Sequence, residues 1–145
     1  MKRIISGLMK IGQNFKESYC HIPYTFNHWR AFRNLEDQLY NKKKLSGDKY
    51  LWKRHYFHDW DKLVIFFLMP WLGDRWVNKY HRTNRNHHPE ENKSVEDIDW
   101  IEAVIDWECA RFTKPDKPLN ARQTLEKYYK SYENICLPVI DYLGL

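Results

Sequence analysis

The stretch FHDWDKLVIFFLMP, residues 57–70, decides how the rest of the chain is interpreted. Its polar doublet, His58 and Asp59, is followed by an apolar run that is too short to cross a bilayer. Pro70 ends or kinks that run, because proline lacks the N–H that continues a helix. The stretch predicts a buried helix beside a polar pair, and that pair is either two metal ligands or the rim of an aromatic core.

The composition is that of one folded domain. The chain has 145 residues, of which 43% are hydrophobic, 17% aromatic and 30% charged, which excludes a disordered chain. The net charge of +5 favours anionic partners such as nucleotides or nucleic acid. Part of this charge lies in Lys42, Lys43 and Lys44, for which a solvated helix end is the alternative interpretation.

The chain shows no signal for export or membrane insertion. Its three cysteines, Cys20, Cys109 and Cys136, are an odd number without motif spacing, which favours reduced thiols. The basic N-terminus has no small-residue cleavage site after its apolar run. We therefore expect a cytoplasmic protein, in the host cytoplasm if a phage encodes it, with no membrane partner and with a homodimer left open.

Apolar side chains recur at helical spacing, and no segment predicts a strand with confidence. This predicts an all-α, compact bundle of five to seven helices in a single domain over residues 1–145. Thr25 is expected to cap the first long helix and Asn120 the last one, while Pro23 predicts a loop before Thr25. The expected helices cover residues 1–16, 25–44, about 48–69, 71–81, about 97–112 and 120–143. The expected parts are an N-terminal extension (1–20), a motif-bearing core (25–112) and a C-terminal helix (119–143).

Histidines and carboxylates recur on several of these segments, and imidazole nitrogen with carboxylate oxygen suits a divalent metal ion. Each residue alone has a simpler alternative, because a histidine among aromatic residues is commonly a hydrogen-bonded core residue. HHPE (87–90) equally fits the start of a helix with Pro89 in its first turn. The candidate ligands are His28, His58, Asp59, His81, His87, His88 and Asp106.

Three acidic residues, Asp99, Glu102 and Asp106, share one face of the helix expected over 97–112. Like charges stacked in this way repel each other unless a cation or basic groups offset them. The spacing therefore favours a face directed towards a metal ion.

Four blocks in this order resemble the HD-domain metal-dependent phosphohydrolases, and more closely a small family of phage and bacterial domains with HD-like patterning. That family is expected to carry T-x-x-H, HD-x-S-K, N-x-HHPE and E-M-x-x-DW. The chain carries TFNH (25–28), HDWDK (58–62), NRNHHPE (84–90) and EAVIDW (102–107). Two departures are Asp61, where a small residue is usual, and the absence of an acidic residue soon after Lys62.

The resemblance implies a metal-dependent phosphomonoesterase or phosphodiesterase with one or two divalent ions (Mn, Fe, Co, Ni, Zn or Mg). It implies that His28, His58, Asp59 and Asp106 hold one ion, and that His81, His87 and His88 complete a second site. Activated water would attack phosphorus while Lys62 offsets charge. Glu102 or Glu90 would orient the water, and Arg82 and Arg85 would bind phosphate.

The expected substrate is a nucleotide or related phosphate ester, with nucleic acid as a less favoured partner. The rival hypothesis is a non-catalytic, phage-type helical protein that binds a host protein or nucleic acid. Its candidate surface is WKRH (52–55).

Overall fold

The computed structural model describes residues 2–45, 57–92, 96–114 and 116–145. All regular elements in these ranges are helices, which confirms the all-α prediction. The helix expected from about residue 48 and the candidate surface at 52–55 lie outside the described residues. The α-helices are α1 (Lys2–Asn41), α3 (Trp60–Leu68), α4 (Asp74–Asn84), α5 (Asp97–Thr113), α6 (Ala121–Tyr128) and α7 (Glu133–Leu143); the short 3₁₀ helices are η1 (Pro70–Leu72) and η2 (Lys130–Tyr132).

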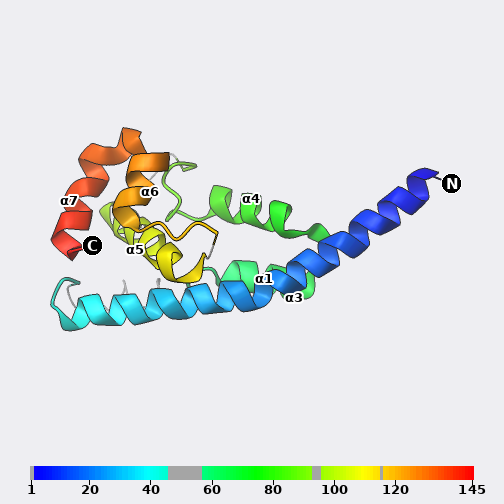
Figure 1. The fold of residues 1–145 in the computed structure, drawn as a ribbon, viewed down its shortest axis with the longest axis horizontal. Coiled ribbons are helices and arrows are strands. Elements are labelled where there is room, and N and C mark those ends of the chain that lie inside the picture. Colours follow the sequence, from blue (N-terminus) through cyan, green and yellow to red (C-terminus); the bar gives the residue numbers. More distant parts are fainter. Residues whose placement is uncertain (1, 46–56, 93–95, 115) are drawn as a thin grey trace.

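The first long helix, α1, is continuous, so the loop predicted for residues 17–24 is wrong and Thr25 is not its N-cap. Pro23 lies inside α1, and the helix changes direction along its length (Figure 1). Tertiary contacts hold the helix before the proline, through Ser18 and His21, and after it, through His28, which contacts Thr113. The Ser18 hydroxyl donates to the carbonyl of Pro70 at 2.8 Å, and the His21 ring stacks on Phe66.

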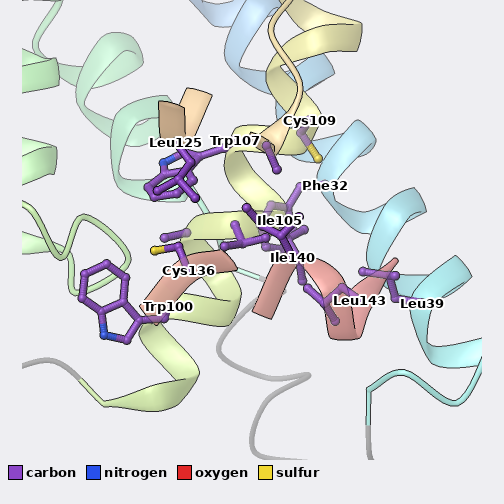
Figure 2. Packing of buried hydrophobic residues seen from close by; sticks show 13 residues of the cluster. Phe32, Leu39, Trp100, Ile105, Trp107, Cys109, Leu125, Cys136, Ile140 and Leu143 are labelled. Atoms are coloured by element: carbon purple, nitrogen blue, oxygen red, sulfur yellow. The ribbon is translucent and has the colours of Figure 1, made fainter. Parts of the chain in front are cut away.

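The N-terminal end of α1 extends beyond the other elements, whereas its later half lies along α3 and α5 (Figure 1). The core forms where this later half meets α5, α6 and α7 (Figure 2). Phe32 is fully buried there, and burying a phenylalanine contributes about 1.5–3 kcal/mol. Because α5 runs through this core, its position relative to α1 is strongly constrained.

The turn after α4 is held by one side chain. The Asn92 amide donates to the carbonyls of Arg82, Arg85 and His88, at 3.2, 2.8 and 2.9 Å. HHPE therefore forms turns, not the start of a helix, and α4 continues to Asn84, beyond the helix end predicted at residue 81. These bonds give the segment a defined path over α4 although it has no regular structure.

The C-terminal region departs from the prediction of one helix. Asn120 is the N-cap of α6, as predicted, and accepts a hydrogen bond from the backbone of Gln123. The helix ends at Tyr128, a 3₁₀ turn follows, and α7 then begins at Glu133. The break therefore lies near Tyr129, whereas Pro138 is inside α7. No helix in the described ranges is long and apolar enough to cross a membrane.

Candidate metal centre

Seven candidate ligands from five parts of the fold converge in one buried cluster. They are His28 on α1, His58 and Asp59 before α3, His81 on α4, His87 and His88 in the turn after it, and Asp106 on α5. Six of these residues are buried, and the side chain of Asp106 is 18% exposed. The sequence-predicted set is therefore brought together as a group.

The doublet converges because of an unusual backbone angle. Asp59 precedes α3 with φ 60° and ψ 6°, the left-handed region that residues other than glycine rarely adopt. Neighbouring residues in a regular helix or strand would diverge. The turn instead allows Asp59 Oδ1 to lie 3.8 Å from His58 Nε2. This local strain is typical of functional sites.

The ring nitrogen Nδ1 of His28 is held by α5. Thr113 Oγ1 lies 2.9 Å from it and donates its own hydrogen to the carbonyl of Cys109. The hydroxyl must therefore accept from Nδ1–H, which places the proton on Nδ1. The opposite nitrogen, Nε2, lies 2.6 Å from Asp106 Oδ1 inside the cluster.

Buried Glu102 holds two rings at once. Its Oε1 lies 3.0 Å from Nδ1 of His58 and 3.1 Å from Nδ1 of His87. Carboxylate oxygen can only accept a hydrogen bond when ionised, so both imidazoles donate from Nδ1. This assignment leaves Nε2 of each ring directed to the cluster, and the two ring centroids are 4.5 Å apart.

The remaining two histidines follow the same pattern. Nδ1 of His81 lies 2.9 and 3.0 Å from the two oxygens of Asp61. Nδ1 of His88 lies 3.2 Å from Oε1 of Glu90. All five rings therefore donate from Nδ1 to a group behind them, which is the arrangement that orients metal-ligating histidines.

Three of the inward-facing ligand atoms lack hydrogen-bond partners, whereas Nε2 of His28 contacts Asp106 and Nε2 of His81 contacts Nε2 of His87. Among the described residues, His58 Nε2, His88 Nε2 and Asp59 Oδ1 are buried and make no hydrogen bond. Buried polar atoms are rarely left without one. Their chemistry, imidazole nitrogen and carboxylate oxygen, is that of a divalent-cation site.

The candidate ligand atoms form three groups, and the atoms within each group lie within 4.8 Å of one another. Asp59 is grouped with His58 and His87, and each of these histidines also belongs to one of the other two groups. Asp59 therefore lies where it can bridge those two groups. The groups are His28, His58 and Asp106; His81, His87 and His88; and His58, Asp59 and His87. The cluster is therefore compatible with a metal ion.

Electrostatics differ between neighbouring rings. Burial lowers the pKa of His87 to about 4, and the charge on His58 adds to this effect. Burial also opposes charge on His58, but Asp59, Asp106 and Glu102 overcome it and raise its pKa to about 10. Without a metal ion, the cluster therefore holds a proton on His58 that offsets the carboxylates.

The pKa of Asp59 lies well below its usual range. Burial opposes this shift, but the nearby charges of Lys62 and His58 outweigh it. Lys62 Nζ donates to Asp59 Oδ2 at 2.9 Å, so the two oxygens of Asp59 have separate environments. Lys62 therefore lies beside a candidate ligand and is 17% exposed.

The predicted phosphate-binding residues, Arg82 and Arg85, lie at the edge of the centre and are already paired. Arg85 Nε lies 3.1 Å from Asp61, and Arg82 Nη2 lies 3.1 Å from Glu90. Glu102 and Glu90 contact Nδ1 of histidines and can position their rings, and their predicted contact with water stays a prediction. Asp99 belongs to the acidic face predicted on α5. Its side chain accepts a hydrogen bond from the backbone N–H of Glu96 at the start of the helix.

Two supporting residues were missed from the sequence. Asp61 was noted only as a departure from a small residue, although it holds His81. Thr113 gave no signal, because its contact with His28 spans most of the chain.

Comparisons with protein-family models, curated proteins and solved structures gave no match, so the family resemblance rests on the four sequence blocks.

Proposed function

We propose that the chain is an HD-like metal-dependent phosphohydrolase acting on a nucleotide or related phosphate ester. The observation that carries the proposal is the shared orientation of five histidines, each donating from Nδ1 outward and directing Nε2 inward. A core histidine satisfied by packing has no need for this pattern. The order of the four sequence blocks supports the HD-like part of the proposal.

The ligands would divide between two ions. His28, His58, Asp59 and Asp106 would hold one, and His81, His87 and His88 would hold the other with Asp59 between them. Divalent ions in such sites supply Lewis-acid activation of water at neutral pH and charge stabilisation at phosphorus. Two ions also suit a phosphoryl group, which presents several oxygens.

The chain's own residues would orient and balance this chemistry. Glu102, Asp61, Glu90 and Thr113 fix the imidazole rings through Nδ1. Lys62, beside Asp59, would offset negative charge on the phosphoryl oxygens. Asp106 is the ligand with the greatest exposure in the first group, so that side of the centre is accessible to a substrate.

The test begins with metal content. Protein purified without chelator or affinity metal should contain one or two equivalents of a divalent ion by elemental mass spectrometry. Loaded protein should then hydrolyse p-nitrophenyl phosphate or bis(p-nitrophenyl) phosphate, and chelator should abolish turnover. Metal-loaded protein that releases no phosphate from either ester or from a nucleotide panel would overturn the proposal.

A second candidate is the non-catalytic interaction role, and the exposed apolar side of α1 favours a protein partner. Ile4, Ile5, Leu8 and Ile11 are exposed on the part of the helix that extends beyond the other elements (Figure 1). Large exposed apolar groups at helical spacing are typical of helix-mediated contacts. Absence of bound metal even after Mn²⁺ is added would favour this candidate over the hydrolase.

A further inference from the structure

A cavity of about 290 Å³ reaches the centre between α5, α6 and the turn after α4. Two candidate metal ligands, His88 and Asp106, line it. His88 is 8% exposed, and its Nε2 makes no hydrogen bond with a described residue. The cavity therefore connects solvent with residues of the candidate metal centre.

The cavity walls follow from helix geometry. Asp106, Ala110 and Lys114 are spaced by four residues on α5 and at its end, so they share one face. Thr124 and Tyr128 have the same spacing on α6. The small side chain of Ala110 leaves room in the middle of this face, between the ligand Asp106 and the lysine.

The outer part of the cavity is basic. Lys114 and Lys117 line it, and neither makes an ion pair within the described ranges. Arg82 also lines the cavity, but it is bonded to Glu90 and lies 3.3 Å from Glu91. The two lysines are therefore the cations available to a phosphate group that enters here.

One wall is aromatic. Trp107 and Tyr129 stack with ring centroids 4.7 Å apart and planes at 11°. Tyr128 lies beside them, lines the cavity and is 50% exposed. Lys127 Nζ lies over its ring, 5.3 Å from the centroid, so a ligand would stack on the face turned away from Lys127. Aromatic side chains of this kind bind flat heterocyclic rings by stacking.

A different cavity, of about 320 Å³, also touches the centre through His58, Asp59 and His87. Among the described residues, its lining includes one arginine, Arg85, which is already paired with Asp61, and no lysine. Charge therefore favours the cavity beside α6 for an anionic substrate.

We propose, on the basis of the proposed function, that the substrate is a phosphate monoester carrying one nucleoside-sized aromatic group and binds in the cavity beside α6. Lys114 and Lys117 bind its phosphate as it approaches Asp106 and His88, and Tyr128 stacks on its ring. The volume of about 290 Å³ lies just below the usual range for ligand sites, roughly 300–1,000 Å³, which suits one nucleoside better than an oligonucleotide.

The test uses full-length, Mn²⁺-loaded protein and calorimetric binding of adenosine 5′-monophosphate and of inorganic phosphate. The double variant Lys114→Gln/Lys117→Gln should weaken both by about tenfold with unchanged metal content. Tyr128→Ala should weaken the nucleotide by at least about fivefold and leave phosphate unchanged. Tyr128→Phe keeps the ring and should bind normally.

Lys10→Gln/Lys16→Gln is the matched control, because it removes the same charge from exposed positions on α1. Normal nucleotide affinity in both the Lys114/Lys117 variant and Tyr128→Ala would overturn the cavity assignment, even in an active hydrolase. Nucleotide binding that these variants weaken, without any turnover in wild type, would support the cavity and overturn the hydrolase. Loaded wild type that binds neither probe would overturn the cavity assignment.

Discussion

Both carboxylate oxygens of Asp61 lie within hydrogen-bond distance of His81 Nδ1, at 2.9 and 3.0 Å. The opposite nitrogen, Nε2, consequently faces Asp59 Oδ1 at 2.9 Å. Arg85 Nε also lies 3.1 Å from Asp61 Oδ2. An acidic residue that departs from the resembling family's pattern thus has a definite structural role, which is to orient one candidate ligand.

Removing this support should weaken one half of the centre. We expect Asp61→Ala to lower metal affinity of the group His81, His87 and His88 by about 10- to 100-fold, because the orienting partner of a histidine ligand is lost. Calorimetric titration of chelator-stripped protein with Mn²⁺ would measure it. Asp37→Asn, at an exposed position on α1, is the control. Unchanged affinity in Asp61→Ala would contradict this role.

Substitution of Asp59 should remove more bound metal than substitution of Asp106. Asp59→Asn should lose both ions, because Asp59 lies between the two groups, whereas Asp106→Asn should lose one. Asparagine tolerates the left-handed backbone at position 59, which keeps the fold testable. Elemental mass spectrometry gives the stoichiometry, and circular dichroism checks the fold. Equal losses in the two variants would argue against a bridging Asp59.

The stability of chelator-treated protein should depend on pH in both directions. The folded-state pKa of His58 is raised to about 10, so its stabilising contribution is complete below about pH 6.5 and is lost as pH rises towards 10. The folded-state pKa of His87 is lowered to about 4. As pH falls, His87 therefore binds a proton in the unfolded chain before it does so in the folded chain. The free energy of unfolding consequently decreases between about pH 6.5 and 4.

Urea unfolding in chelator at pH 5, 7 and 9 should consequently give the highest free energy of unfolding near neutrality. His58→Gln should reduce the loss on the alkaline side, since the titrating group is gone. A wild-type stability that stays level from pH 7 to 9 would contradict the raised pKa of His58.

Phe32 links the core to the centre. It is fully buried on α1 and stacks on the His58 ring with centroids 4.0 Å apart and planes at 13°. Phe32→Ala should lower the free energy of unfolding by about 3–5 kcal/mol and loosen His58. Phe112→Ala removes a 62% exposed ring and should change it by about 0.5 kcal/mol or less. Urea unfolding of both variants measures the difference.

The sequence by itself determined the helical class, most of the candidate ligand set and the start of α6. Apolar spacing is a local property, and Asn120 caps its helix through a residue only three positions away. The ligand types were visible for the same reason, because TFNH, HDWDK, NRNHHPE and EAVIDW are short blocks. Local patterns therefore predicted most of the residues that meet in the candidate metal centre.

Tertiary structure alone decided how α1 passes Pro23 and which atoms of the cluster face inward. The proline favours a break by local rules, yet contacts such as Ser18 with Pro70 hold the helix across it. The tautomer of His28 likewise depends on Thr113, from a distant helix. Such partners meet only when helices pack, because the energy of a buried hydrogen bond depends on position in space and not on spacing along the chain.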